Sequence, residues 1–99
     1  MVRRTAREPF LLGFGKHLRS LRTRAELSQE ELADRAGIHV TYLSGVERGL
    51  RNPSIRNVRR LAQAMGVPTK ELFSFEEPPP GSNDQPARLT NKDGSRLSS

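Results

Sequence analysis

The chain has 99 residues, with 17 Lys and Arg against 11 Asp and Glu, and a formal net charge of +6. This length allows one small domain with tails and excludes a second hydrophobic core. There is no cysteine, which excludes disulfides, thiolate catalysis and cysteine-based zinc sites. The longest apolar run, residues 10–12, is too short for a membrane span or a signal peptide, so we expect a cytoplasmic protein.

The positive charge is concentrated in the first three quarters of the chain. Residues 1–75 carry 14 Lys and Arg against 7 Asp and Glu, whereas residues 76–99 carry 3 against 4. A basic folded part is typical of proteins that meet phosphate groups. A basic surface that contacts only solvent would give the same balance, so charge alone leaves nucleic acid as one of two interpretations.

Composition divides the chain into three parts. Residues 1–8 form a basic flexible arm that would follow a phosphate backbone or enter a minor groove, or else a frayed terminus without a role. Residues 76–99 are polar and of low complexity after three prolines, which predicts a disordered tail. The domain is therefore expected within residues 9–75.

Periodicity and helix-capping signals predict five helices and an all-α fold. The first begins at Pro9 and repeats apolar residues at steps of three and four: Leu11, Phe14, Leu18, Leu21 and Ala25. Gly13 and Gly15 make its start uncertain, because each glycine weakens a helix by about 1 kcal/mol.

The second helix carries a complete start signal. Ser28 and Glu31 have the spacing of a capping box, and Leu27 and Leu32 have the spacing of a hydrophobic staple. Gly37 ends this helix, because glycine readily adopts the left-handed turn that closes a helix. A third helix then runs to Gly49, with Leu43, Val46 and Glu47 on its inner face.

Pro53 prevents the third helix from continuing. Ser54, the next residue, is expected to cap the start of the fourth helix. Its apolar stripe is Ile55, Val58, Leu61, Ala62 and Met65. Gly66 and Val67 fit a Schellman ending, and residues 70–73 form a short fifth helix.

The outer face of the third helix is the best candidate site. A recognition helix needs a row of short or polar side chains without a role in the core, and we expect the base-facing residues to be His39, Val40, Thr41, Ser44 and Gly45. Methyl groups of Val or Thr can pack on the thymine methyl group. An exposed glycine inside a helix is unfavourable, and either close approach of DNA or sequence drift explains Gly45.

Groups suited to phosphate surround this row. The expected contacts are Gln29, Tyr42, Arg48, Arg51, Asn52 and Ser54. Gln29 lies at the start of the second helix, where unpaired N–H groups attract anions. Each of these residues alone is also compatible with an ordinary polar surface, and only their combination supports a phosphate-binding role.

Catalysis is not expected. The two histidines, His17 and His39, fall on different predicted helices, and no nucleophile elbow, phosphate loop or zinc-binding spacing surrounds them. We therefore expect no enzymatic activity, no metal, no cofactor and no small-molecule ligand.

Three sequence runs together resemble a known family. LSQEELADRAGI (residues 27–38), YLSGVERG (42–49) and LAQAMGVP (61–68) resemble the lambda-repressor-like, Cro/C1 or XRE, helix-turn-helix family. IHVTY (38–42) and VERGLRN (46–52) are similar to controller proteins of restriction–modification systems. The resemblance implies a buried Arg22–Glu47 pair, a phosphate contact by Gln29 and base-facing positions at 40, 41, 44 and 45. The chain departs from the pattern at two positions. Glu26 stands where the family usually has glycine, and Val40 stands where controller proteins usually have arginine.

The resemblance also implies a function. It predicts a transcriptional regulator that binds double-stranded DNA at a palindromic operator as a homodimer, with two recognition helices about 34 Å apart. The expected dimer interface contains Val67, Phe73 and Phe75, whereas Leu72 is expected in the monomer core. The alternative is an antitoxin-like interaction module whose tail wraps a partner protein.

Overall fold

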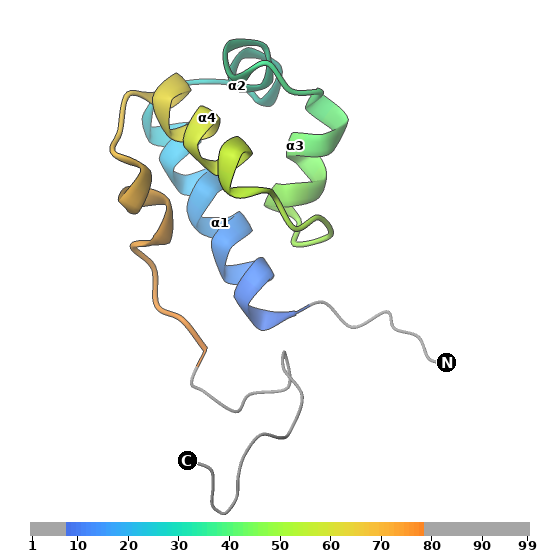
Figure 1. The fold of residues 1–99 in the computed structure, drawn as a ribbon, viewed down its shortest axis with the longest axis vertical. Helices are drawn as coiled ribbons and strands as arrows, with labels where there is room; N and C mark the ends of the chain where they lie inside the picture. Colours follow the sequence, from blue (N-terminus) through green and yellow to red (C-terminus); the bar gives the residue numbers. More distant parts are fainter. Residues whose placement is uncertain (1–7, 79–99) are drawn as a thin grey trace, which may run out of the picture.

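The computed structural model describes residues 8–78, which contain four α-helices, one 3₁₀ helix and no strand. The helices are α1 Pro9–Arg24, α2 Gln29–Ala36, α3 Val40–Glu47, α4 Ile55–Met65 and the 3₁₀ helix η1 Thr69–Phe73. The long helix α1 contacts α3 on one side and η1 on the other, and α4 crosses in front of it and contacts α2 (Figure 1). The all-α prediction is confirmed, but the fifth element is a 3₁₀ helix.

Two expected segments lie almost entirely outside the described residues. Only Glu8 of the expected arm 1–8 is described, and only residues 76–78 of the expected tail 76–99. Among the helices described, none is both long enough and apolar enough to cross a membrane.

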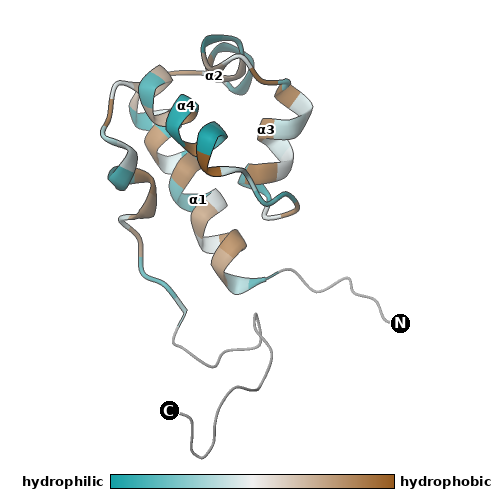
Figure 2. Cartoon of the chain, in the orientation of Figure 1, coloured by the Kyte–Doolittle hydropathy of each residue, from teal (hydrophilic) through white to brown (hydrophobic). Residues whose placement is uncertain are grey.

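One apolar core joins all five elements, and the hydrophobic residues of the helices are coloured brown in Figure 2. Its buried residues are Phe14, Leu18, Leu21, Leu27, Leu32, Ala33, Ala36, Leu43, Val46, Val58, Leu61, Ala62 and Leu72. Two predicted core positions are wrong. Ala25 lies after the last turn of α1 and is exposed, and Ile55, the first residue of α4, is 77% exposed.

All four α-helices end in the same turn. A residue with positive φ follows each helix, and the next N–H donates to the carbonyl five residues earlier, at 2.8–3.2 Å. Three of the residues with positive φ are glycines: Gly37, Gly49 and Gly66. The fourth is Glu26, at φ 62°, which lacks the conformational freedom of glycine. Position 26 therefore keeps the left-handed turn that glycine favours, and Glu26 bears the steric cost.

Side-chain caps begin α2 and α4 as predicted. Ser28 Oγ accepts a hydrogen bond from the N–H of Glu31 at 3.0 Å, and the Ser28 N–H donates to Glu31 Oε1 at 2.8 Å. These hydrogen bonds with Ser28 lower the pKa of the Glu31 carboxyl below its ordinary value. At α4, Ser54 Oγ accepts from the N–H of Asn57 at 3.1 Å.

Gly15 decides how closely α3 approaches α1. The helix runs through both Gly13 and Gly15, and a Cβ on Gly15 would collide with the carbonyl oxygens of Val46 and Glu47. The glycine that weakens the helix in isolation thus lets the last turn of α3 rest on the α1 backbone. On the other side of α1, His17 Nε2 donates to the Glu71 carbonyl at 2.6 Å and holds η1, whose Leu72 is fully buried.

The strain at Glu26 gives a stability prediction. Replacing Glu26 by glycine removes a left-handed conformation that costs a residue with a Cβ about 1–2 kcal/mol, partly offset by the larger entropy of glycine in the unfolded chain. We expect Glu26→Gly to raise the free energy of unfolding by about 0.5–1 kcal/mol, measured by urea denaturation. Glu26→Ala keeps the Cβ and should bring no such gain; equal gains in both variants would contradict strain as the cause.

Candidate nucleic-acid interface

The exposed face of α3 presents short side chains beside one another. His39, Val40 and Thr41 are exposed at the start of the helix, and Ser44 follows one turn later, half-buried. The opposite face of α3 packs Leu43 and Val46 into the core. The predicted division of α3 into an inner and an outer face is therefore present, with one exception.

Gly45 is the exception, because it is buried although the sequence places it on the outer face. The side chain of Arg51, from the loop after α3, lies across it: a Cβ on Gly45 would be 2.7 Å from Arg51 Cγ. The Arg51 guanidinium carbon then lies 6.0 Å from the centre of the Tyr42 ring. The expectation that Gly45 itself is accessible is thus wrong, and an arginine occupies the space where its side chain would be.

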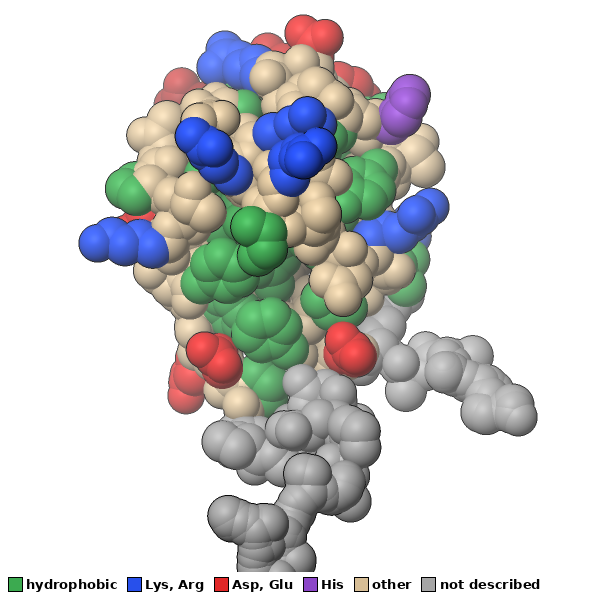
Figure 3. Space-filling view, in the orientation of Figure 1, with side chains coloured by type: hydrophobic (Ala, Val, Ile, Leu, Met, Phe, Trp, Pro, Cys, Tyr) green, Lys and Arg blue, Asp and Glu red, His purple; other side chains and the backbone are tan. Residues whose placement is uncertain are grey.

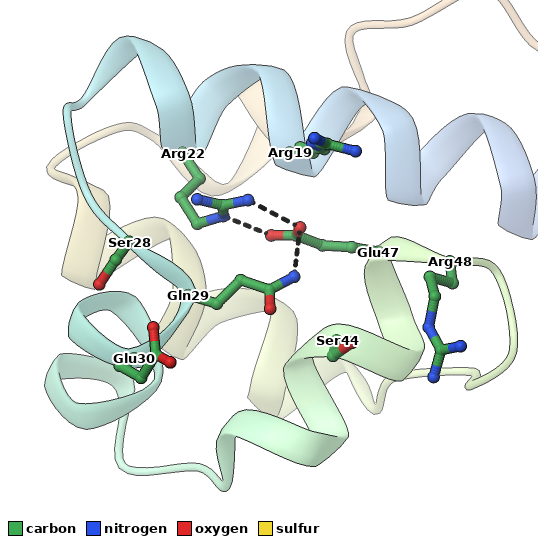
Figure 4. Close-up of a pocket in the computed structure, with 8 residues that line it drawn as sticks. All are labelled: Arg19, Arg22, Ser28, Gln29, Glu30, Ser44, Glu47 and Arg48. Atoms are coloured by element: carbon green, nitrogen blue, oxygen red, sulfur yellow. Dashed lines mark hydrogen bonds and ion pairs between the residues drawn. The ribbon is translucent and has the colours of Figure 1, made fainter.

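An ion pair ties α3 to α1 behind this face. Arg22 Nε and Nη2 donate to the two carboxylate oxygens of Glu47 at 2.7 and 3.0 Å (Figure 4). Arg22 Nη1 donates to the Leu27 carbonyl at 2.8 Å, which also fixes the turn before α2. Gln29 Nε2 donates to Glu47 Oε1 at 2.9 Å. One carboxylate therefore connects α1, α2 and α3.

Both members of the pair are buried, Arg22 at 8% and Glu47 at 7% exposure. The hydrogen bonds to Glu47 raise the pKa of Arg22 above its ordinary value, against the opposing effect of burial, and the charges of Glu47 and Glu30 add to the increase. The guanidinium therefore stays charged at every pH at which the domain would be studied. The interaction is bidentate, which gives it a defined geometry as well as a defined charge.

The other residues expected at phosphates differ in their surroundings. Arg48, Arg51 and Asn52 are exposed. Tyr42 is half-buried, and its hydroxyl accepts a hydrogen bond from Asn57 Nδ2 of α4 at 3.2 Å. Ser54 uses its hydroxyl to cap α4. Asn57 was not among the expected site residues; it lies in the first turn of α4, where its N–H reaches the Ser54 cap and its side chain reaches Tyr42.

A second missed residue is Arg19, one turn before Arg22 on α1. Arg19 lines a hollow of about 440 Å³ between α1, α2 and α3, opposite Arg48 (Figure 4). The spacing of three residues between Arg19 and Arg22 places both on one face of a helix. This spacing from Arg22 could have identified Arg19 from the sequence.

Of the three residues expected at a dimer interface, Phe73 and Phe75 both lie against Phe14, at ring-centre distances of 5.5 and 6.2 Å, and Val67 lies elsewhere. Phe75 packs within its own chain against Phe10 and Phe14, at ring-centre distances of 5.4 and 6.2 Å. Val67 lines a separate hollow, near Leu21 and Met65. Phe73 is 40% exposed, although one side of its ring packs on Phe14.

Phe73 lies on an apolar groove that the sequence analysis did not predict. The groove has a volume of about 180 Å³ and is lined by Phe10, Leu11, Phe14, Asn52, Pro53, Ile55, Val58 and Phe73. Ile55 and Phe73 are two of the four exposed large hydrophobic residues of the described chain. In Figure 3 this apolar patch lies between basic side chains above and acidic side chains below.

Comparison with known families gives a clear match. The family model HTH_3, described as helix-turn-helix, matches residues 18–72. The chain belongs to the helix-turn-helix family. The matched segment of this helix-turn-helix protein runs from Leu18 of α1 to Leu72 of η1, so it contains the exposed face of α3 and the Arg22–Glu47 pair.

The similar proteins include control proteins of restriction–modification systems and another DNA-binding regulator. The control protein C.BamHI of Bacillus amyloliquefaciens is 41% identical over 63 residues, covering 63% of this chain and 78% of its own. The crystal structure of the restriction–modification controller protein C.AhdI from Aeromonas hydrophila is similar, with 49% identity, a TM-score of 0.63, and coverage of 64% of this chain and 96% of that one. SinR, the master regulator for biofilm formation solved in complex with DNA, gives 32% identity and a TM-score of 0.59, covering 62% and 98%.

The buried ion pair gives a testable prediction. Glu47→Gln keeps the size of the side chain but leaves the Arg22 charge buried without its partner, so we expect a loss of about 3–5 kcal/mol in the free energy of unfolding. Urea denaturation measures this. The double variant Arg22→Met, Glu47→Leu removes both charges and should recover most of the loss. If the double variant is less stable than Glu47→Gln, the buried charge is not the cause.

Proposed function

We propose that this protein is a non-enzymatic transcriptional regulator that binds a twofold-symmetric DNA operator as a homodimer. The observation that carries the proposal is the exposed face of α3, which the Arg22–Glu47–Gln29 hydrogen bonds hold in a fixed orientation against α1 and α2. A rigid helix with short, exposed side chains fits the DNA major groove. The DNA-bound SinR structure supports this reading at the level of the family.

Base reading is shared between α3 and the loop that follows it. His39, Val40, Thr41 and Ser44 are small enough for α3 to lie deep in the groove. None of them is a long side chain with two donors. Arg51, which lies across Gly45, carries that chemistry to the same surface, and an arginine with two aligned donors is the commonest partner of guanine. We therefore assign Arg51 a base-reading role beside the phosphate contact expected from the sequence.

Phosphate contacts flank this surface. Tyr42 accepts a hydrogen bond from Asn57, so its own O–H remains a donor for a phosphate oxygen. Gln29 lies at the start of α2, held by Glu47, with one amide N–H beyond the one that Glu47 accepts. Arg48 supplies a positive charge at the end of α3. Such contacts set the position and orientation of the protein without reading sequence.

The apolar groove of Ile55 and Phe73 is the proposed dimer interface. The exposed side of α4 carries Arg56, Arg59 and Arg60 and no acidic residue, whereas Glu76 and Glu77 follow η1. A twofold axis that runs across the patch in Figure 3 from side to side brings the basic region of one copy onto the acidic region of the other. The same axis leaves α3 of both copies on the same side of the dimer (Figure 1), as a symmetric operator requires.

Base reading and phosphate binding are separable by mutation. Against a site selected from random duplexes, Arg51→Ala should lower discrimination at one base pair by about 1–3 kcal/mol, and Gly45→Ala should reproduce this because its methyl group displaces Arg51. Arg48→Ala should instead weaken binding to all duplexes alike and reduce the salt dependence by about one unit of slope. Competition binding at several salt concentrations gives both quantities. Uniform weakening in all three variants would refute the assignment, and equal binding of random DNA by the wild type would refute the operator proposal.

The dimer interface is tested first at Ile55, which is 77% exposed, and then at Phe73, which is 40% exposed and also packs on Phe14. Ile55→Ser and Phe73→Ser should each shift the protein towards monomer in sedimentation velocity, because they remove apolar surface from the proposed contact. Leu50→Ser is the matched control, since Leu50 is 47% exposed and outside the groove. If the Leu50 variant dissociates and the other two remain dimeric, the interface lies elsewhere.

A further inference from the structure

The hollow between α1, α2 and α3 joins two of the phosphate contacts proposed above, Gln29 and Arg48, to two charged residues without an assigned role, Arg19 and Glu30. It has a volume of about 440 Å³ and is mainly polar. Arg19 comes from α1, Gln29 and Glu30 from the first turn of α2, Ser44 from the middle of α3 and Arg48 from its C-cap (Figure 4). Three elements therefore bring side chains to one opening.

The charges around this opening do not cancel. At its floor, Arg22 and Glu47 form the buried pair and neutralise each other. Around the rim lie two positive charges, on Arg19 and Arg48, and one negative charge, on Glu30. Neither rim arginine is paired with a carboxylate elsewhere in residues 8–78. The rim therefore has a net charge of +1, which matches the single negative charge of a phosphodiester group.

We propose that this hollow binds one phosphate of the DNA backbone, with Arg19 as a contact from α1 and Glu30 as an opposing charge that limits affinity. The inference rests on the proposed DNA-binding function and names a binding residue outside the helix-turn-helix pair itself. It extends the DNA contact from α2 and α3 to the first helix of the fold.

The position of the hollow indicates DNA as the source of the phosphate. Ser44 belongs both to the exposed face of α3 and to the lining of the hollow. A backbone strand that borders the groove containing α3 therefore passes the opening. The Gln29 amide, held by Glu47, and the guanidinium groups of Arg19 and Arg48 supply the donors that a phosphate accepts.

Glu30 allows a prediction of the sign of a mutational effect on DNA binding. Its carboxylate faces the same opening as the two arginines and acts on Arg22 through its charge. A phosphate that enters the hollow meets this negative charge. Removing the charge should therefore strengthen DNA binding, an outcome that a purely structural role of the hollow does not give.

The first measurement removes the α1 contact. Arg19→Ala should weaken binding to the selected site about eightfold at 0.1 M salt and reduce the slope of log K against log salt by about 0.9, the value for one phosphate contact. Arg24→Ala is the matched control, because it removes the same charge from the same helix but lines a different hollow. Equal effects of the two variants would overturn the proposal by showing only a general charge effect.

The second measurement removes the opposing charge. Glu30→Gln should tighten binding by about two- to threefold at 0.1 M salt, the range expected for one exposed charge pair, and by less at higher salt. Asp34→Asn makes the same charge change on the same helix without lining the hollow, so it should have a smaller effect. Weaker or unchanged binding by Glu30→Gln would overturn the proposal.

Chemically modified DNA identifies the phosphate itself. Duplexes with a neutral methylphosphonate at one backbone position are compared for the wild type and Arg19→Ala. At the phosphate that enters the hollow, the two changes should not add, because each removes the same contact. If the wild type binds its site specifically and every position is additive with Arg19→Ala, Arg19 contacts no phosphate and this inference fails, while the proposed function, with its contacts from Gln29 and Arg48, stands. If the wild type binds no site specifically, the proposed function fails and this inference fails with it.

Discussion

A single buried carboxylate sets the geometry of this domain. Glu47, at the end of α3, accepts two hydrogen bonds from Arg22 of α1 and one from Gln29 of α2. Burying two charges is expensive, and a pair of this kind contributes defined orientation more than net stability. Here the orientation is that of α3 relative to α1 and α2, and the exposed face of α3 depends on it.

Close backbone contact supports the same arrangement. Gly15 lets the last turn of α3 rest on α1, which brings Glu47 within reach of Arg22. Gly45 acts on the other face of α3, where the absence of a side chain admits Arg51 from the following loop. Two glycines inside helices, each unfavourable for the helix alone, thus position both the ion pair behind α3 and the arginine in front of it.

The proposed DNA surface then has three parts with different chemistry. Short side chains on α3 allow close approach, Arg51 adds a long donor, and the rim of the hollow between α1, α2 and α3 adds charge. The apolar groove of Ile55 and Phe73 lies apart from these groups. The proposed sequence reading, phosphate binding and dimerisation are therefore assigned to largely different residues, and separate mutations can test them.

Local signals in the sequence determined the helix boundaries, because caps and left-handed turns depend on neighbours within one or two helical turns. Ser28, Glu31, Gly37, Ser54 and Gly66 all act in the predicted way, and the helical class of the fold followed from them. Contacts between distant segments were decided only by the tertiary structure. Arg51 covers Gly45, Phe75 packs on α1, Ile55 is exposed, and Arg19 and Arg48 line the same hollow. Periodicity reports which side of a helix is apolar, but whether that side meets another element, and at what distance, depends on how the helices cross.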